Sequence, residues 1–400
     1  MRRRVVITGI GILTAHGTGK DATWSRIKSG ASGISDITSF DSSKYRAKQG
    51  GEIKDFEEIP LANLKDKRLD RATRLLVHAA REALEEADIF HFLKNHPVLL
   101  SLGTTLGGMI SGELFHKEVL ALGLNRARLS LVHDYLAHCQ AINVFKEFKL
   151  RGDFLIFSNA CASGANAVGQ AFNSIRCGEY DLAVCGGYDT MSEFTFAGFN
   201  SLMAMSPSLC RPFDKNRDGL VLGEGAGIMV LEELEHALKR NAKISGELAG
   251  YGESSDAYHM TCPEPSGKPA AAAITKAWNE AGNPQIDYIN AHGTATKFND
   301  PMETNAILSA LGERAGEIPV SSTKPMIGHL LGGAGAVEAI ISLFSIMHKT
   351  LPPTINYETP DPECGLNIIK EAESYNVKTV LSNSFGFGGS NAAVILKEYE

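Results

Sequence analysis

Short apolar runs that end in glycine recur along the chain, and longer segments with helical periodicity separate them. Four such runs lead into a glycine, at residues 5–9, 98–103, 182–187 and 380–386. Residues 70–88 show a spacing close to 3.6 at their apolar positions, which are Leu75, Leu76, Ala79, Ala80, Ala83, Leu84 and Ala87. Strands bounded by glycine that alternate with amphipathic helices are typical of an α/β fold.

The same pattern divides the chain into two halves. A charged segment at residues 235–243 follows the strand-like residues 228–231 and precedes a second series of strand-like runs. We therefore expect an N-terminal half over residues 1–240 and a C-terminal half over residues 241–400, packed together rather than independent. Other expected elements are a buried Ala/Gly-rich helix, a largely apolar helix and a polar surface excursion, at residues 162–176, 334–347 and 41–70.

Composition and charge narrow the possible functions. Of the 400 residues, 44% are hydrophobic and 21% are charged, which is ordinary for a globular protein. The net charge of −7 argues against nucleic acid as a partner, and an acidic partner would need a local basic patch. Gly9 and Gly11 interrupt the first apolar run, so it predicts a strand and a turn rather than a signal peptide. No uninterrupted apolar stretch approaches the ~20 residues that span a bilayer, so we expect a cytoplasmic protein without membrane insertion.

The cysteines point to one unusual residue. Seven occur, at wide spacing and without a CxxC pair, so neither a disulfide framework nor a metal site is expected. Cys161 follows an apolar run at residues 154–158, which predicts a buried strand, and it precedes the Ala/Gly-rich helix. The positive end of a helix dipole favours a thiolate, and the small neighbours Ala160, Ala162 and Gly164 let a substrate approach. The alternative is a structural cysteine in a tight turn.

Two histidines lie in similar glycine-containing turns after strand-like runs. His292 follows the run at residues 288–291 and begins the sequence His-Gly-Thr-Ala-Thr. His329 ends the sequence Lys-Pro-Met-Ile-Gly-His after the run at residues 320–323. Because loops at strand ends are where α/β folds collect catalytic groups, we predict that both histidines act with Cys161.

A third glycine-rich turn has the sequence Asn-Ser-Phe-Gly-Phe-Gly-Gly-Ser-Asn at residues 383–391. Backbone N–H groups in such a turn can form an anion site. The dinucleotide-binding and Walker patterns are not matched in context, so a nucleotide site is not expected. Exposed N–H groups beside Phe385 and Phe387 fit an oxyanion hole with a gate better.

The Cys161 turn, the two histidine turns and the glycine-rich turn occur in the order seen in β-ketoacyl-(acyl-carrier-protein) synthases. The motifs resemble those of this family and are closest to those of β-ketoacyl synthase II. Further matches lie at residues 211–219, 254–261 and 352–356, so the resemblance covers nearly the whole chain. It implies a thiolase-like fold, in which two related βαβαβ halves form a five-layered α-β-α-β-α core, usually as a homodimer. It also implies an elongating enzyme, because thiolases use a second cysteine, initiating synthases use Cys-His-Asn and chain-length partner subunits lack the nucleophile.

The reaction that the resemblance implies is a decarboxylative condensation. Cys161 takes an acyl group from an acyl carrier protein, while the N–H groups of Cys161 and Phe387 hold the carbonyl oxygen. A malonyl thioester then loses carbon dioxide, and His292 and His329 stabilise the resulting enolate. The carbanion attacks the acyl group and yields a 3-ketoacyl thioester. No cofactor or metal is required for these steps.

Further site residues also follow from the resemblance. Lys324 is expected to pair with Glu303 and to organise the charge of the site, and Phe387 to act as a gate when the acyl group loads. Thr294 and Thr296 are expected to bind the pantetheine arm, and Phe385 is expected to lie beside the malonyl site. Met109 and Ile110 are expected to line the acyl tunnel, and Thr261 is a further expected substrate contact. For Met109 and Ile110 the alternative is ordinary core packing.

An acidic carrier protein needs a basic docking surface on a chain with a negative net charge. Lys65, Lys67 and Arg68 resemble the family's docking cluster, and Arg71 opens the first long helix beside them. Arg211 is a further candidate. The alternative is a solvated charged face without a partner.

The sequence departs from the family between about residues 113 and 153. Residues 127–132 replace a usual Ser-Pro-Phe-Phe segment, and Asp153 and Lys297 each stand where proline is usual. The middle region helps to build the dimer interface and the acyl pocket in the family, so chain length and substrate shape stay open. The alternatives are a dedicated ketosynthase of an unusual fatty acid or polyketide pathway and a non-catalytic chain-length partner, against which the intact Cys161 argues.

Overall fold

The computed structural model describes residues 3–54, 56, 59–64, 69–93 and 96–400. The strands are β1 (Val5–Thr14), β2 (Gly17–Thr18), β3 (Ser35–Asp36), β4 (Gln49–Gly50), β5 (Val98–Gly103), β6 (Gly152–Phe157), β7 (Leu182–Asp189), β8 (Gly225–Glu233), β9 (Gly246–Ser255), β10 (Tyr288–Asn290), β11 (Pro319–Ser321), β12 (Thr350–Leu351), β13 (Asn367–Ile368), β14 (Glu373–Ser374), β15 (Thr379–Gly386) and β16 (Ser390–Lys397). The helices are α1 (Lys20–Lys28), α2 (Arg71–Ala87), α3 (Met109–Leu122), α4 (Ser130–Tyr135), α5 (Ala137–Phe148), α6 (Ser163–Arg176), α7 (Glu193–Ser201), α8 (Leu234–Lys239), α9 (Lys268–Glu280), α10 (Asn299–Leu311), α11 (Lys324–Ile327) and α12 (Ala334–His348). Short 3-10 turns are η2 (Leu124–Arg126), η3 (Ala160–Ala162), η4 (Glu313–Glu317), η5 (Leu331–Gly333) and η6 (Phe387–Gly389).

One large mixed sheet runs through the molecule, and its two halves have the same topology. The first half has the strand order β1-β8-β7-β5-β6, and the second half repeats it as β9-β16-β15-β10-β11. In each half three strands are parallel and the strand next to them is antiparallel. Antiparallel pairing of β1 with β9 joins the halves. The predicted α/β fold with two related halves is confirmed, while the division at residue 240, between α8 and β9, stays a prediction.

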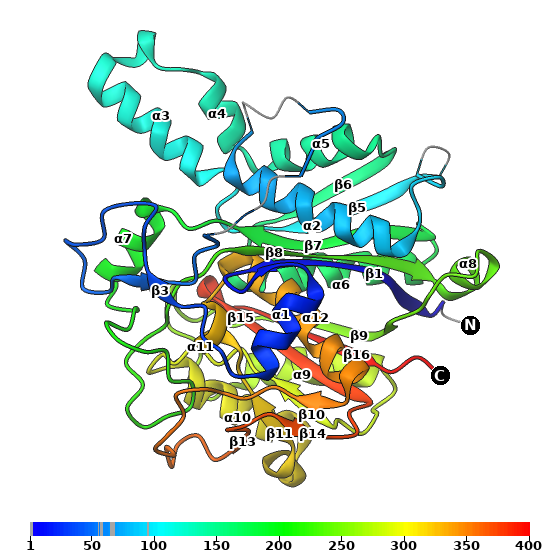
Figure 1. Ribbon diagram of the computed structural model, residues 1–400. Helices are drawn as coiled ribbons and strands as arrows, with labels where there is room; N and C mark the ends of the chain where they lie inside the picture. The colour runs from blue at the N-terminus through cyan, green and yellow to red at the C-terminus, as the bar shows by residue number, and fades with distance from the viewer. Residues whose placement is uncertain (1–2, 55, 57–58, 65–68, 94–95) are drawn as a thin grey trace.

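Helices cover the sheet halves in layers (Figure 1). Helices α2 and α5 cover the outer face of the first half, α9 and α10 cover that of the second, and α6 and α12 lie between the halves. The order is therefore α-β-α-β-α. Residues 331–348 form the one segment in the described part of the chain that is long and apolar enough to cross a membrane, but 89% of it is buried. Its place between the two half-sheets makes it a core helix.

Helix α2 shows how closely sequence and packing agree in the first half. It spans Arg71–Ala87, within the predicted range; the Asp70 carboxylate caps it by accepting from the N–H of Thr73. The expected turn at Gly9 and Gly11 is wrong, because β1 continues through both to Thr14. A Cβ atom at Gly11 would lie 1.9 Å from the carbonyl oxygen of Ala79 in α2. These glycines therefore let helix and strand approach rather than break the strand.

The predicted burial of the strand before Cys161 is also wrong. β6 lies at one end of the sheet order, and Phe154 and Leu155 are 37% and 39% exposed. The apolar run correctly indicated a strand, but a run of this kind does not distinguish a central strand from an edge strand.

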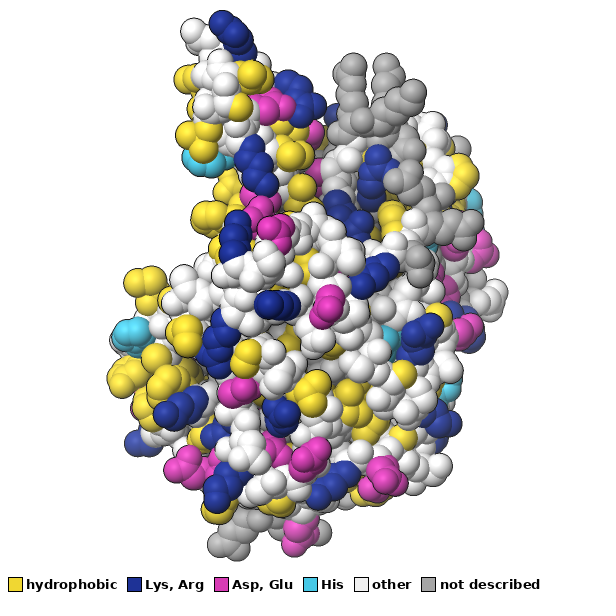
Figure 2. All heavy atoms as spheres, turned by 60° about the vertical axis from the view of Figure 1, so that its left-hand side comes forward, with side chains coloured by type: hydrophobic (Ala, Val, Ile, Leu, Met, Phe, Trp, Pro, Cys, Tyr) yellow, Lys and Arg dark blue, Asp and Glu magenta, His cyan; other side chains and the backbone are white. Residues whose placement is uncertain are grey.

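The first part of the region that departs from the family lies in an arm formed by α3, η2 and α4, whereas its later part forms α5 and the start of β6. The arm stands away from the layered body in Figure 1 and again at the top of Figure 2, where apolar and basic side chains share its surface. Arg128 donates to the carboxylate of Glu118 at 2.6 Å and thereby ties the returning segment to α3. Exposed leucines mark this arm, namely Leu114, Leu120, Leu122, Leu124 and Leu129.

Candidate active site

Cys161 lies in the turn between β6 and α6. Ala160, the residue before it, has a φ of 55°, a left-handed conformation that is strained for a residue with a Cβ atom. The hydroxyl of Ser163 stabilises the turn, because it donates to the carbonyl of Ala160 at 2.6 Å and accepts from the N–H of Asn159 at 2.9 Å. The cysteine side chain is only 6% exposed.

Glycines bring the start of α6 against the start of α12. A Cβ atom at Gly164 would lie 2.7 Å from the carbonyl oxygen of Gly332, and one at Gly335 would lie 2.7 Å from the backbone nitrogen of Ala165. Side chains at these positions would separate the two helices. The close contact carries Cys161 from the N-terminal half to the loops of the C-terminal half.

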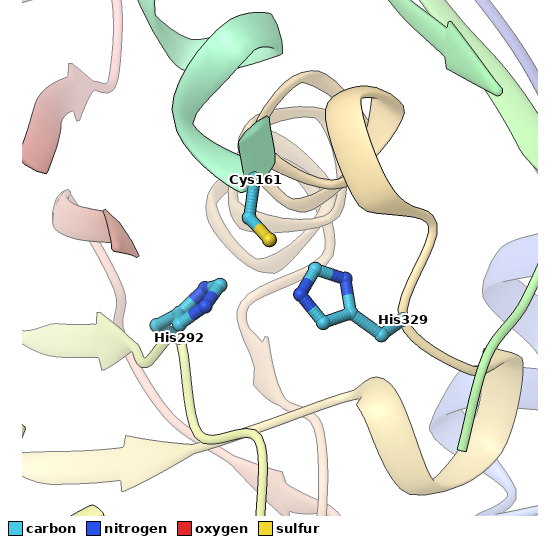
Figure 3. Close-up of side chains that lie close together, drawn as sticks. All are labelled: Cys161, His292 and His329. Atoms are coloured by element: carbon cyan, nitrogen blue, oxygen red, sulfur yellow. The ribbon is translucent and has the colours of Figure 1, made fainter. Parts of the chain in front are cut away.

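Both predicted histidines converge on this thiol (Figure 3). His292 follows β10, and His329 follows α11. Their ring centroids are 5.2 Å apart with an interplanar angle of 83°. One ligating atom each of Cys161, His292 and His329 lies within 4.8 Å of the others, and all three side chains are buried. The structure thus brings together three residues that are separated by up to 168 positions in the chain.

A cavity of about 1060 Å³ leads to the three side chains. Its lining includes Cys161 and both histidines, and it also includes the residues expected to contact substrate: Thr261, Thr294, Thr296, Phe385 and Phe387. Met109 instead lines a second hollow of about 710 Å³ between the arm and α7, and Ile110 lines neither of these two hollows. Neither Met109 nor Ile110 is thus among the residues that line the cavity at Cys161, and their place along the acyl tunnel stays a prediction.

Hydrogen bonds fix the tautomers of both imidazoles. The N–H of Leu331 donates to Nδ1 of His329 at 3.1 Å. The ammonium of Lys324, which has donors only, lies 3.3 Å from Nδ1 of His292. Both Nδ1 atoms are therefore acceptors, and the hydrogen of each neutral ring is on Nε2. Burial, followed by the charge of Lys324, holds the pKa of both histidines well below the ordinary value, so both are neutral at pH 7.

The expected pairing of Lys324 with Glu303 is wrong. Lys324 Nζ donates to Glu338 Oε1 and to the carbonyl of His292, each at 2.5 Å. Glu303, at the start of α10, instead accepts from the backbone N–H groups of His292 at 2.7 Å and Gly293 at 2.8 Å. Burial raises the pKa of Glu303 to about 7 against the opposing effect of these two donors. Glu303 thus holds the histidine loop, and Glu338 neutralises the lysine.

A signal for Glu338 was present in the sequence. It is the one charged residue in α12 before the terminal histidine, on a helix that is otherwise apolar or small. A carboxylate on a fully buried helix requires a cationic partner, because an unpaired buried charge is very costly. Lys324, in a short helix that is also buried, is that partner.

The expected thiolate at Cys161 is not what the environment favours. Burial raises the pKa of the thiol to about 12, although the Lys324 ammonium and the backbone N–H of Phe387 act in the opposite direction. Helix starts do lower thiol pKa values, but desolvation dominates at a side chain this deeply enclosed. The resting nucleophile is therefore a thiol, and its proton must leave during the reaction.

The glycine-rich turn connects β15 to β16 beside the thiol. The backbone N–H of Phe387 faces the thiol closely enough to lower the pKa of Cys161 against the effect of burial, and the Phe387 ring stacks on Phe199 at a centroid distance of 5.7 Å. Gly388 has a φ of 79°, and its N–H donates to the carbonyl of Met260 at 2.7 Å. The turn therefore presents a backbone donor to the reacting centre and places an aromatic side chain next to it.

Asp189 is a site residue that sequence reasoning missed. Its buried carboxylate accepts from the Thr104 hydroxyl at 2.6 Å and from the backbone N–H groups of Thr105, Leu106 and Gly332. Burial raises its pKa to about 6. An acidic residue at the end of the buried strand β7 was the available signal. Asp189 joins the loop after β5 to the loop that carries His329.

Of the four predicted docking residues, the structure describes only Arg211. Lys65, Lys67 and Arg68 lie outside the described residues. The guanidinium of Arg211 is half-buried and donates to Ser208 Oγ at 3.2 Å. Arg71 pairs with the buried Glu224 at 2.5 Å, so part of its charge is already neutralised within the chain.

Other cations lie at the cavity mouth. Lys215 and Lys297 are exposed and line it, whereas Arg217 forms an ion pair with Asp361 and donates to the carbonyl of Thr296 at 3.2 Å. The mouth also carries apolar side chains that are more than half exposed, namely Leu202, Met203, Tyr258 and Phe298.

A buried thiol and two neutral imidazoles at the junction of two related α/β halves define a thiolase-like condensing enzyme. The chain belongs to the β-ketoacyl synthase family. Residues 2–237 match the family's N-terminal domain, and residues 245–358 match its C-terminal domain.

Individual relatives agree over the full length. The chain is 40% identical to a 3-oxoacyl-(acyl-carrier-protein) synthase 2 of Synechocystis, over 100% of this chain and 99% of the relative. It is 38% identical to the synthase of the same name from Staphylococcus aureus, with the same coverage. Among solved structures, the ishigamide ketosynthase/chain length factor superposes with a TM-score of 0.95 at 36% identity and full coverage of both chains. A β-ketoacyl synthase from Burkholderia phymatum gives a TM-score of 0.91 at 33% identity, again with full coverage.

Proposed function

We propose that this chain is a 3-oxoacyl-(acyl-carrier-protein) synthase that elongates fatty acids by condensing an acyl-cysteine with a malonyl thioester. The observation that carries the proposal is the convergence of Cys161, His292 and His329 within 4.8 Å at the end of a large cavity. The full-length relatives at 38–40% identity, which are named 3-oxoacyl-(acyl-carrier-protein) synthase 2, support this function over a specialised polyketide pathway. The presence of Cys161 argues against a non-catalytic subunit.

In the first step the Cys161 sulfur attacks the carbonyl of the acyl-carrier thioester. The sulfur–acyl bond forms, the bond to the carrier thiol breaks, and the thiol proton of Cys161 ends on the departing carrier thiol. The N–H of Phe387, which lowers the pKa of Cys161, is suited to stabilise the negative oxygen that develops beside it. This first step needs no group other than Cys161 and the acyl-carrier thioester to balance its bonds and its proton.

In the second step a malonyl thioester loses carbon dioxide and becomes an enolate. The Nε2–H donors of His292 and His329 serve this step, because their Nδ1 atoms are occupied as acceptors. Both rings are neutral, so they stabilise the oxygen by hydrogen bonding and not by charge, an effect typically worth about 3–4 kcal/mol per donor. The carbanion then attacks acyl-Cys161, the carbon–carbon bond forms, and the carbon–sulfur bond breaks. The sulfur leaves as a thiolate, which takes a proton from water to regenerate the thiol.

The partner is an acyl carrier protein that docks at the cavity mouth. A solved relative at 30% identity is described as a type II polyketide acyl-carrier protein in complex with its ketosynthase. Here Lys215 and Lys297 offer positive charge beside the exposed apolar Met203 and Phe298. That combination suits an acidic protein whose substrate arm must reach a buried thiol.

A homodimer is the assembly that we expect, through the exposed edge strand β6. Phe154 and Leu155 lie there without cover in the single chain, and an uncovered apolar edge is a usual interface between copies. Replacing Leu155 with lysine should shift the chain towards monomer in sedimentation analysis.

We place the protein in the cytoplasm, since all seven cysteines are free.

Mass spectrometry of Cys161 tests the proposed function. Incubation with acyl-carrier proteins of graded chain length should add the matching acyl mass to Cys161, and malonyl-carrier protein should then release a 3-ketoacyl product. A Cys161→Ala variant is the control. Absence of acylation with every carrier, together with no labelling by the cysteine-directed inhibitor cerulenin, would favour a non-catalytic subunit instead.

A further inference from the structure

The catalytic side chains form a donor set that normally binds soft metal ions. In the described part of the chain, Cys161, His292 and His329 are the one group of three ligating residues whose atoms lie close enough to hold an ion. A thiolate with two imidazoles and one open position towards a cavity is the pattern of a catalytic zinc site. Ligand atoms around tetrahedral zinc lie ~3.3–3.7 Å apart, so small side-chain rotations would suffice to coordinate it. Zinc bound there would block the nucleophile.

The hydrogen-bond partners of the two rings oppose this coordination. A histidine that ligates a metal through Nε2 carries its hydrogen on Nδ1 and donates it to a carboxylate, carbonyl or water. Here each Nδ1 faces a donor instead: the Lys324 ammonium for His292 and the Leu331 N–H for His329. Moving the hydrogen to Nδ1 would set two donors against each other inside a buried site, at the cost of the existing hydrogen bond.

We propose that Lys324 and the backbone N–H of Leu331 protect the catalytic set from zinc and related soft divalent ions by locking both imidazoles as Nε2–H tautomers. The three hydrogens of Lys324 have three acceptors, which are Glu338 Oε1, the His292 carbonyl and His292 Nδ1. The ammonium is therefore held in one orientation. Lys324 acts here as a positioning residue, and this role is separate from the condensation chemistry.

A charge-balanced double variant tests the role of Lys324. K324M/E338M removes one positive and one negative charge, so the net charge of the site is unchanged while the donor to His292 is lost. Since outer-shell partners of metal-bound histidines typically change affinity ~10–100-fold, we expect Cys161-dependent zinc affinity to rise by at least ~10-fold. The measurement is zinc competition against a chromophoric chelator, with cobalt absorption to detect a metal–thiolate bond.

Two controls separate donor loss from other effects. K349M/E398M removes a surface ion pair of the same charge, with a separation of 2.8 Å, and should leave zinc affinity at the wild-type value. Adding Cys161→Ala to K324M/E338M should abolish the gained affinity. The proposal is overturned if the wild-type chain binds zinc through Cys161 as tightly as K324M/E338M does.

A second measurement needs no variant and therefore stands even if K324M/E338M does not fold. Nitrogen-15 spectra of the wild-type chain with labelled histidine report directly which ring nitrogen carries the hydrogen. We expect Nε2–H for both His292 and His329, with spectra unchanged by equimolar zinc. A hydrogen on Nδ1 of either ring, or a zinc-induced shift of both, would overturn the proposal without affecting the assignment of Cys161 as nucleophile.

Discussion

The two halves of the molecule share one backbone arrangement and use it for different chemistry. In each half a short 3-10 turn precedes a central helix, and a residue at that turn adopts a left-handed φ: Ala160 at 55° before α6 and Leu331 at 52° before α12. In the N-terminal half the turn presents a nucleophile, Cys161. In the C-terminal half the corresponding N–H groups bind inward, to Nδ1 of His329 and to Asp189.

The nucleophile and the groups that stabilise negative charge therefore come from different halves of the molecule. The N-terminal half contributes the thiol, whereas the C-terminal half contributes both imidazoles, the Lys324–Glu338 pair and the Phe387 N–H. Neither half is a complete site. The packing of α6 on α12 is therefore as necessary for activity as the reactive groups themselves.

Removing the nucleophile should have the largest effect on the condensation rate. C161A should lower condensation at least ~10³-fold, because the covalent intermediate cannot form. Decarboxylation of malonyl-carrier protein should persist, since the groups of the C-terminal half are intact. Product mass spectrometry and carbon dioxide release measure the two steps. If C161A stops both equally, the proposed division between the halves is wrong.

Forcing the two central helices apart should come next in size. At Gly164 an added Cβ would lie 2.7 Å from the Gly332 carbonyl, so G164A should destabilise the fold by about 1–3 kcal/mol and also reduce condensation. Urea denaturation measures the stability change. Gly198, in the helix α7, is the matched control because its Cβ would meet nothing within 4 Å. Equal stability changes in G164A and G198A would contradict the packing argument.

The pH dependence of the Cys161 alkylation rate tests the protonation state of this thiol. Burial raises the pKa of Cys161 to about 12, so the thiolate fraction grows with pH throughout the range in which the protein is studied. The rate of Cys161 alkylation by a small reagent should therefore climb about tenfold per pH unit without a plateau below about pH 9. The exposed Cys177 controls for reagent chemistry. A plateau near neutral pH would show that the helix start outweighs burial.

Charge reversal at the cavity mouth should have the smallest effect. K297E should raise KM for carrier-bound substrate about threefold to tenfold at low ionic strength, and the effect should shrink as salt is added. Its kcat should change little. K243E makes the same charge change on an exposed residue that does not line the cavity, and it should leave KM unaltered. Equal effects from both variants would remove Lys297 from the docking surface.

Much of the site could be read from local patterns. Cys161, His292 and His329 each stand in a distinctive turn after a strand-like run, so their settings were visible without coordinates. The limits of α2 were visible for the same reason, since its periodicity and its Asp70 cap are local features. The partner of Lys324 was not visible in the sequence, because the chain offers several carboxylates and only tertiary packing selects Glu338.

By itself the sequence determined which segments become strands and helices and which residues carry the chemistry, because these depend on neighbours a few residues away. Tertiary structure decided what depends on distant contacts: that β1 continues through Gly11 beneath α2, that β6 lies at an edge, and that Met109 lines a different hollow from Cys161. It also decided the protonation of the site. Burial and hydrogen-bond direction are properties of the assembled fold, and they determine whether a thiol or an imidazole carries its proton.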